Sequence, residues 1–439
     1  MVAPAPTRGR RTWSAGPDLE GVIVTVPRSV SELTEPLTAD SAHARVASSA
    51  LTDSVLGPVG LEVETHLVDL EAVADRVGWA RIDGILPALK DTAGGSSVTV
   101  EPGGQIELSG PPAADVSEAA TLMRDEVQRA RLRLLPHGLG LAHAGADPLR
   151  LSRRVNPNPR YQAMEEHFVA TGRALPGLAM MNSTAALQVN VQAGPRAAWA
   201  ARVAHAHRLG PTLIAISACS PWLAGRDTGW RSVRQRIWAD LDARQCGPMA
   251  GTDEPAEEWA RYAMRAPVVF VRHDVGADAV RTAVPFSAWV SGAAALHGRA
   301  PTTADLDRHL TTLFPPVRLR GYLELRYLDM SPPRWWPAVA TVAATLMDDA
   351  RACDAAAEAA EPAAALWTEA ARDGLRHPVI AQSARRCMEI AVDRAPTELA
   401  TAVSDLAQLV ERGRCPGDDL AERITQVGPR AAFEELAHA

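Results

Sequence analysis

Four segments of the sequence alternate between apolar and polar residues, and this alternation constrains the fold more than any other feature. In "GLEVETH" (residues 60–66), Leu61 and Val63 alternate with Glu62 and Glu64. Because successive side chains of a β-strand point to opposite faces, such a segment has one apolar and one polar face. The same pattern recurs in "QIELSG" (105–110), "ALQVNVQ" (186–192) and "YLELRYLD" (322–329). The sequence therefore predicts a sheet with one buried face and one polar face.

The polar faces carry carboxylates, amides and a guanidinium group. They could belong to ordinary antiparallel strands whose outer faces meet water. Glutamate is disfavoured in strands, however, and carboxylates two residues apart repel each other, so this face is costly unless it binds a cation. Oxygen ligands without a His or Cys cluster favour Mg²⁺ over Zn²⁺. The residues concerned are Glu62, Glu64, Glu101, Glu107 and Glu324, with Gln188, Asn190 and Arg326. The pattern indicates a Mg-nucleotide platform for phosphoryl transfer.

The chain lacks the usual lysine-containing phosphate loop. Lys90 is its only lysine and is followed by Asp91, so no GxxxxGK[ST] motif is present. A phosphate group would have to be held by arginine, backbone amides or metal, and Arg326 beside Glu324 is a candidate. The cysteines are odd in number and scattered without CxxC spacing, so neither a disulfide framework nor a zinc site is indicated. They are Cys219, Cys246, Cys353, Cys387 and Cys415.

Composition narrows the class of ligand. The 439 residues are 47% hydrophobic and 22% charged, enough to bury a large core. A net charge of -7 without blocks of like charge gives no reason to expect a nucleic-acid or membrane partner, and no obligate protein partner is indicated. No apolar run reaches the roughly 18 residues of a membrane span. The arginine pair in "TRGRRTWS" precedes no apolar export segment, so we expect a cytoplasmic protein with small-molecule substrates.

The chain divides into three stretches without a linker between independent domains. Residues 1–28 are rich in Pro, Gly, Arg and Ser, which predicts a frayed or disordered segment. From Ser29 to Leu328 strand-like and helical segments alternate, and Asp115 or Ser117 could cap a helix that ends before Gly138. Residues 337–439 are alanine-rich with helical periodicity and form a predicted helical C-terminal layer. Residues 29–439 are therefore predicted to form a single domain.

At these residues the chain resembles a known family. The plant-type glutamate–cysteine ligases are similar to it over roughly residues 55 to 435, most closely their actinobacterial branch, which serves ergothioneine biosynthesis. The resemblance is carried by "GLEVETH", "TVEPGGQIELSG", "MMNSTAALQVNV", "SPWLAGRDTGWRSVRQRIWADLD" and "HLTTLFPPVRLRGYLELRYLD". It implies an α+β fold like that of glutamine synthetase, in which a curved, mainly antiparallel sheet forms an active-site cleft flanked by helices.

The resemblance also implies roles for individual residues. Glu62 and Glu64 match the first metal-binding pair, Glu101 and Glu107 the second acidic motif, and Glu324 a late metal ligand. Arg326 would contact the transferred phosphate as a catalytic residue, and Arg234, also taken as catalytic, would line the substrate pocket with Trp238. Gln188 and Asn190 would lie at the substrate and ATP site. Arginines that could hold substrate carboxylates are Arg153, Arg154 and Arg160.

The reaction of that family is an ATP-dependent ligation. The γ-carboxylate of L-glutamate takes the γ-phosphoryl group of ATP, and the amine of L-cysteine then attacks γ-glutamyl phosphate to give γ-glutamylcysteine. The resemblance implies ATP and two or three Mg²⁺ ions as cofactors, and L-glutamate, L-cysteine and ATP as substrates. Two alternatives remain open from the sequence: a ligase with another acceptor amine, and a non-catalytic protein that binds an anion on its polar face.

Two places in the sequence depart from the family pattern, and one further residue lies next to the first acidic pair. Cys219 occupies a place where many relatives have asparagine, which puts an amide hydrogen bond there in doubt. Arg244 lies one place earlier than the arginine of relatives, and Gln245 takes the expected slot. His66 flanks the acidic pair and is predicted to be structural rather than a metal ligand.

Overall fold

The centre of the molecule is a seven-stranded sheet. The computed structural model describes residues 37–91 and 95–439, so the predicted frayed segment 1–28 lies outside the described residues. The strands follow the order β10-β11-β5-β1-β3-β2, and β4 also pairs with β1. Their bounds are β1 (Val59–Asp69), β2 (Ser97–Val100), β3 (Ile106–Ser109), β4 (Leu139–Ala142), β5 (Ala186–Gln192), β10 (Val317–Leu319) and β11 (Tyr322–Asp329). Every strand pair in this sheet is antiparallel, in agreement with the mainly antiparallel sheet that the family resemblance implied.

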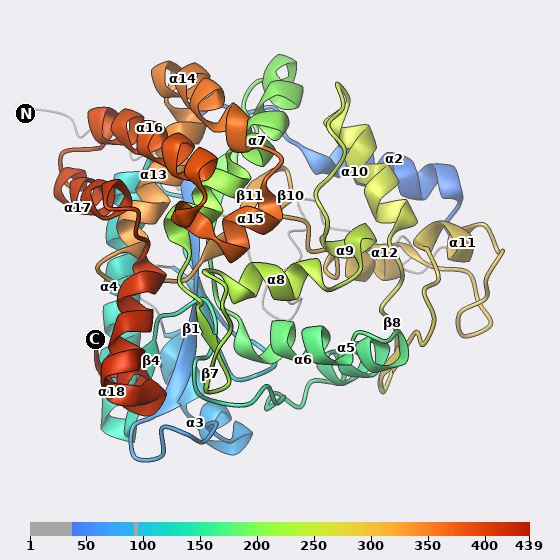
Figure 1. Ribbon diagram of the computed structural model, residues 1–439. Coiled ribbons are helices and arrows are strands. Elements are labelled where there is room, and N and C mark those ends of the chain that lie inside the picture. Colours follow the sequence, from blue (N-terminus) through green and yellow to red (C-terminus); the bar gives the residue numbers. More distant parts are fainter. Residues whose placement is uncertain (1–36, 92–94) are drawn as a thin grey trace, which may run out of the picture.

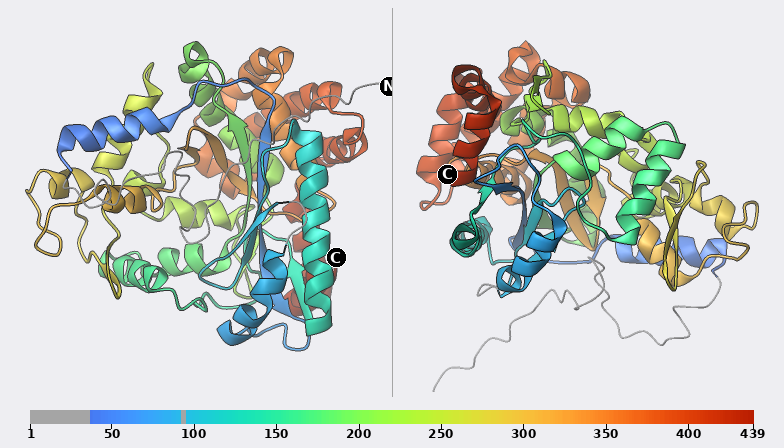
Figure 2. Two further views of the ribbon diagram at one scale, coloured as in Figure 1. Left: turned by 180° about the vertical axis from the view of Figure 1, so that it is seen from behind. Right: turned by 90° about the horizontal axis from the view of Figure 1, so that it is seen from below.

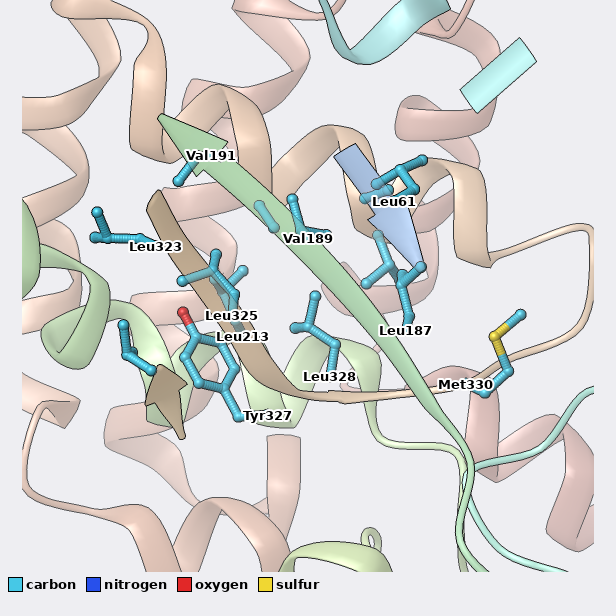
Figure 3. Close-up of a cluster of buried hydrophobic side chains, with 14 of the residues drawn as sticks. Leu61, Leu187, Val189, Val191, Leu213, Leu323, Leu325, Tyr327, Leu328 and Met330 are labelled. Atoms are coloured by element: carbon cyan, nitrogen blue, oxygen red, sulfur yellow. The ribbon is translucent and has the colours of Figure 1, made fainter. Parts of the chain in front are cut away.

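The apolar face of the sheet is buried under helices. Leu61, Leu187, Val189 and Leu325 gather on this face, and each is at most 1% exposed (Figure 3). Three helices pack against it through contacts with β1, β5 and β11. They are α4 (Val116–Leu134), α7 (Trp199–Ser217) and α13 (Trp336–Asp348). Asp115 accepts a hydrogen bond from the backbone N–H of Glu118 and so caps α4, which was one of the two predicted caps.

The C-terminal layer is helical, as predicted. Its elements after α13 are α14 (Ala350–Ala360), α15 (Trp367–Arg372), α16 (Pro378–Arg394), α17 (Ala400–Glu411) and α18 (Pro416–His438). Pro378 and Pro416 stand in the first turns of α16 and α18, where proline lacks only a donor that has no partner within the helix. In Figure 1 α16, α17 and α18 lie to the left of the sheet, and α2, α10 and α12 lie to its right.

Most of the remaining helices lie on the other side of the sheet, to the left in the left-hand view of Figure 2. Those that border the polar face are α2 (Ala39–Ala50), α3 (Trp79–Lys90), α5 (Pro159–Ala170), α6 (Ala174–Ser183), α8 (Val233–Ala239), α10 (Pro255–Arg265) and α12 (Thr303–Leu310). The other short elements are α9 (Ala243–Cys246), α11 (Phe286–Val290), β6 (Trp222–Leu223), β7 (Arg226–Asp227), β8 (Phe270–His273), β9 (Gly276–Ala279), η1 (Leu135–His137), η2 (Arg196–Ala198), η3 (Glu361–Ala363) and η4 (Gly374–Arg376). The architecture is α+β, in agreement with the prediction. Within residues 37–91 and 95–439, no helix is long and apolar enough to cross a membrane.

His309 on α12 makes the stability of this fold sensitive to acid. Its Nε2 is 2.8 Å from the carbonyl oxygen of Ala263, its ring stacks on Phe286, and burial lowers its pKa from 6.5 to about 4. Between these two pH values the unfolded chain binds a proton that the folded chain does not, so stability falls as the pH decreases through this window. The free energy of unfolding of the wild type should therefore fall between pH 7 and pH 5. We expect this fall to be smaller by about 1 to 2 kcal/mol in His309→Gln.

Urea unfolding at the two pH values measures this difference. His43→Gln is the control, because His43 is only partly buried and bonds to Glu257 near the surface. An equal pH slope in wild type and His309→Gln would show that the buried imidazole is not responsible for the acid sensitivity.

Candidate active site

A cavity of about 1190 Å³ lies against the polar face of the sheet. Most of the residues predicted from the sequence line it, namely Glu62, Glu64, Glu101, Glu107, Arg160, Gln188, Trp238 and Arg326. The sheet supplies the floor, and the helices around the polar face supply the walls. Residues from widely separated parts of the chain therefore meet in one place.

The strand register brings the acidic residues into adjacent rows. Glu64 on β1 lies directly opposite Glu107 on β3, and Glu62 lies opposite Gln188 on β5. Amide groups of β5 orient the two carboxylates of β1. Gln188 Nε2 donates to Glu64 Oε1 at 3.0 Å, and Asn190 Nδ2 donates to Glu62 Oε1 at 3.0 Å. The backbone N–H of Ala186 donates to Glu64 Oε2 at 2.7 Å.

The surroundings of these carboxylates disfavour their ionised forms. Burial, with Glu324 and Glu107 nearby, raises the pKa of Glu62 to about 7. Burial, with Glu107 and Glu64 nearby, raises the pKa of Glu101 to about 8. The pKa values of Glu64 and Glu107 are also raised, first by burial. Such a cluster favours a neutralising cation.

Oxygen donors of this kind fit Mg²⁺ by chemistry. In the described residues, however, no three His, Cys, Asp or Glu side chains are gathered closely enough to hold a metal ion. The carboxylates would therefore have to move toward a bound ion. The assignment of these residues as metal ligands stays a prediction.

Glu324 is surrounded by arginines instead of facing the cavity. It is completely buried, it accepts hydrogen bonds from Arg318, and its Oε2 is 3.2 Å from Arg326 Nη1. Burial alone would raise the pKa of Glu324, but Arg318, Arg326 and Arg320 hold it well below its usual range. Glu324 thus orients positive charge beside the cavity, and a role as metal ligand would require it to exchange these partners.

Arg326 links this arginine cluster to the acidic rows. Its Nη1 donates to Gln188 Oε1 at 2.7 Å, and Gln188 in turn donates to Glu64. Its guanidinium group is part of the cavity lining. A fixed positive charge therefore lies next to the glutamates, where a transferred phosphoryl group would meet it.

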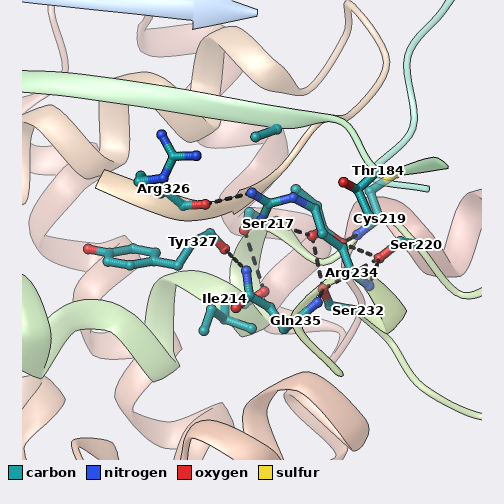
Figure 4. Close-up of polar contacts among 12 residues, drawn as sticks. Thr184, Ile214, Ser217, Cys219, Ser220, Ser232, Arg234, Gln235, Arg326 and Tyr327 are labelled. Carbon is teal, nitrogen blue, oxygen red and sulfur yellow. Dashed lines mark hydrogen bonds and ion pairs between the residues drawn. The ribbon is translucent and has the colours of Figure 1, made fainter. Parts of the chain in front are cut away.

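Arg234 lies behind Arg326 and does not line the cavity. It is 2% exposed on α8, and its Nη2 donates to the backbone carbonyl of Arg326 at 2.7 Å (Figure 4). Its Nη1 is 3.8 Å from Asp329 Oδ1. Neither Nε nor Nη1 of Arg234 has a hydrogen-bond partner among the described residues. Arg234 therefore supports the strand position of Arg326.

Asp329 explains how the chain accommodates Cys219. Its Oδ2 accepts the backbone N–H of Cys219 at 2.9 Å and the hydroxyl of Ser220 at 2.6 Å, and its Oδ1 accepts the hydroxyl of Ser232 at 2.9 Å. The Cys219 side chain is buried and contributes none of these bonds. The backbone N–H of Cys219 thus supplies a polar contact that any residue except proline can make at this position.

One wall of the cavity is apolar. Trp238 on α8 packs against Phe314 with ring centroids 5.4 Å apart, and the indole Nε1 has no hydrogen-bond partner in the described part of the chain. Tyr161, Met164, Met180 and Met181 line the cavity as well. Arg160 is the polar residue of this region, and its Nη2 donates to the Thr311 carbonyl at 3.2 Å. This wall suits the non-ionic part of a small substrate.

Other predicted positions lie away from the cavity lining. Arg153 is exposed, and Arg154 is held by Glu165 at 2.8 Å. Arg244 pairs with Asp242, whereas Gln245 is buried and donates to the carbonyl of Pro267. His66 is buried with its Nε2 3.1 Å from the Ala144 carbonyl, which agrees with its predicted structural role.

We expect this placement to separate Arg153 and Arg160, which were equivalent candidates from the sequence, in kinetics. Arg153→Ala should change kcat/KM for every substrate less than twofold, because its side chain reaches no described cavity atom. Arg160→Ala should lower kcat/KM by roughly tenfold or more, because a guanidinium group at the wall is lost. Steady-state assays of both variants measure the difference, and a larger loss for Arg153→Ala would contradict it.

Sequence reasoning missed several polar residues of the cavity. Arg318 and Arg320 on the β10–β11 hairpin line it, and so do Arg45 and Asp307 from α2 and α12. A signal for the two hairpin arginines was present in "RLRGYLELR", where they alternate with leucine on either side of a glycine turn. No comparable signal marks Arg45 or Asp307, since their positions depend on how helices pack.

The antiparallel sheet with its flanking helices has the fold of a solved glutamate–cysteine ligase. The chain superposes on the crystal structure of such a ligase from Francisella tularensis in complex with AMP, with a TM-score of 0.57, 12% identity and 88% coverage of both chains. At this identity the likeness shows the fold alone.

The sequence comparisons show the family. Residues 58–437 match the model of glutamate-cysteine ligase family 2 (GCS2), and the chain belongs to this family. It is 47% identical over 401 residues to glutamate–cysteine ligase EgtA of Mycolicibacterium smegmatis, covering 91% of this chain and 95% of that protein. It is 49% identical to the EgtA of Mycobacterium tuberculosis, with 90% and 92% coverage. A chloroplastic glutamate–cysteine ligase of Arabidopsis thaliana is 28% identical, with 92% and 84% coverage.

Proposed function

We propose that this protein joins the γ-carboxylate of L-glutamate to the amine of L-cysteine at the expense of ATP. The products are γ-glutamylcysteine, ADP and phosphate, and γ-glutamyl phosphate is the intermediate. The observation that carries the proposal is the convergence of four glutamates and Arg326 on one cavity in a chain of this family. Identity close to one half with two EgtA ligases supports L-cysteine as acceptor and a first step in ergothioneine biosynthesis.

The chemistry of the first step is a problem of charge. The substrate carboxylate and the triphosphate are both anions, so the site has to neutralise charge where they meet. Arg326 is positioned for this by its bonds to Gln188 and Glu324. Arg234 keeps Arg326 in register through its backbone carbonyl. The apolar wall around Trp238 limits access of water to the reactive acyl phosphate.

Metal binding would fall to the half-buried glutamates Glu62, Glu64, Glu101 and Glu107. Mg²⁺ held there would neutralise part of the charge on the triphosphate. Their raised pKa values support this, since each carboxylate that ionises adds repulsion which a cation removes. We expect chelation with EDTA to abolish ADP formation and excess Mg²⁺ to restore it, as a coupled ADP assay would measure. ADP formation that persists in EDTA would exclude these roles.

The extent and location of the enzyme belong to the same proposal. We assign residues 29–439 to a single catalytic domain, supported by a family match that runs from residue 58 to 437. The helices of residues 337–439 then form one layer of this domain. We further propose that the enzyme acts in the cytoplasm on L-glutamate, L-cysteine and ATP, with no obligate protein partner.

The test is the purified protein with ATP, Mg²⁺ and L-glutamate, offered L-cysteine or a panel of other amines. We expect γ-glutamylcysteine by mass spectrometry and one phosphate released per peptide bond. Equal rates with many amines would mean that L-cysteine is not the specific acceptor. The protein would then be a carboxylate–amine ligase that uses a different acceptor amine. Absence of ADP with every amino acid offered would contradict the ligase function.

A further inference from the structure

One end of the cavity is lined by residues that have no role in the proposed phosphoryl transfer. Arg45, Ser48, Ser49 and Thr52 recur at helical spacing along α2 and just beyond it, and all four line the cavity. Residues at this spacing lie on one face of a helix. The match to the family model begins at residue 58, after α2 has ended. The family model therefore says nothing about the polar face of α2, and the contacts of this face decide what it can bind.

The α2 face is fixed to the catalytic sheet. The Thr52 backbone N–H donates to the Gly321 carbonyl at 2.9 Å, and the Gly321 N–H donates to the Ala50 carbonyl at 2.9 Å. Gly321 has a φ of +80°, and an added Cβ would lie 3.1 Å from Thr52 Oγ1. The neighbouring residue Arg320 lines the cavity and interacts with Glu62. The end of α2 is thus joined to the arginine side of the acidic rows.

Arg45 forms an ion pair with a carboxylate on a neighbouring helix of the cavity wall. Arg45 Nε and Nη2 each lie 3.4 Å from Oδ1 of Asp307 on α12. The side chain of Asp307 is 15% exposed and that of Arg45 31%, so both remain accessible from the cavity. Next to this pair, Leu310 and Leu319 supply apolar lining. This end combines an acceptor carboxylate, exposed hydroxyl groups and apolar lining from the half-buried Leu310 and the largely buried Leu319.

That combination matches a nucleoside better than a phosphate. A carboxylate only accepts hydrogen bonds, and the two hydroxyls of a ribose are donors that it binds well, whereas it repels a triphosphate. The Trp238 wall lies among different residues and suits the smaller substrate. Resting on the proposed function, we propose that Asp307 and Ser48 bind the ribose hydroxyls of ATP while its base packs against Leu310 and Leu319. The triphosphate then extends past Arg320 toward the glutamates.

Equilibrium binding of nucleotides tests this subsite without turnover. Asp307→Asn should weaken ATP binding by roughly tenfold, the usual range for losing a hydrogen bond to a charged group. It should leave the binding of 2′,3′-dideoxy-ATP unchanged, because that nucleotide has no ribose hydroxyls to lose. Ser48→Ala, at an exposed position, should weaken ATP binding about two- to threefold. The KM values for L-glutamate and L-cysteine should stay the same.

His43→Ala is the matched control on the same helix. His43 pairs with Glu257 of α10 at 2.8 Å, and neither residue lines the cavity, so ATP binding should not change. An equal loss for ATP and dideoxy-ATP in Asp307→Asn, or no loss for either, would overturn the assignment. So would failure of the wild type to bind ATP. A wild type that binds ATP with this preference but forms no γ-glutamylcysteine would leave the subsite standing and remove the proposed ligase function.

Discussion

Replacement of Arg326 by methionine is expected to lower kcat by roughly 10²- to 10³-fold with the fold retained. Arg326 is the guanidinium group that joins the cavity to Gln188 and Glu324. Methionine fills a similar volume but cannot neutralise charge as it develops on a transferred phosphoryl group. Glu324 keeps Arg318 and Arg320 as partners, so its charge does not become unpaired in the variant. Single-turnover formation of ADP measures the loss.

Two further variants make the result specific. Arg326→Lys keeps the charge but loses the planar geometry, and we expect it to recover only part of the activity. Arg236→Met on the exposed side of α8 removes an arginine that pairs with Asp240 at the surface, and it should be close to wild type. Activity of Arg326→Met within threefold of wild type would rule out electrostatic stabilisation by this residue.

The fold was accessible from sequence where a periodic pattern decides it. Leu61, Val63, Glu62 and Glu64 sort onto two faces because the strand period is two, and the sheet has these faces. Asp115, one of the two predicted caps, marks the start of α4 because its local chemistry acts within a single turn. Such signals need no knowledge of distant parts of the chain.

The pairing of particular side chains was not accessible in this way. Glu64 opposite Glu107, and Glu62 opposite Gln188, follow from strand register, which depends on contacts between segments far apart in sequence. The polar face of a strand also does not reveal which side chains reach the cavity. Glu324 belongs to the predicted face, yet the turn at Gly321 brings Arg318 back across it and closes it off.

Helix packing accounts for the residues that sequence reasoning left out. Arg45 and Asp307 are far apart in the chain and occur in helices with no distinctive motif. They meet because α2 and α12 both border the polar face. Conversely, Arg153, Arg154 and Arg160 of "LRLSRRVNPNPRY" were equivalent candidates, and of these three only Arg160 lines the cavity. A loop without periodicity gives no basis for choosing among them.

Glu107→Gln should uncouple activity from stability. Glu107 lies opposite Glu64, and burial together with Glu64 raises its pKa. Thr99 Oγ1 and Ser109 Oγ lie 2.8 and 3.3 Å from Glu107 Oε1, and glutamine can keep an oxygen there. The neutral amide removes repulsion from the acidic cluster, so we expect the Tm without nucleotide to stay the same or rise. We expect kcat to fall by roughly 10²- to 10³-fold, because a proposed metal ligand is lost.

Thermal unfolding with and without Mg²⁺ and ATP distinguishes this explanation from simple damage to the fold. Ligands that bind only the folded state raise Tm by an amount that grows with the logarithm of [L]/Kd, so the rise should be large for wild type and much smaller for Glu107→Gln. Glu71→Gln, at an exposed position just beyond β1, should match wild type in Tm, in its rise with ligand and in kcat. A Glu107→Gln protein that unfolds earlier than wild type would mean that the carboxylate stabilises the sheet. Its repulsion with Glu64 would then already be compensated within the chain, and the argument for a cation at this site would lose its electrostatic basis.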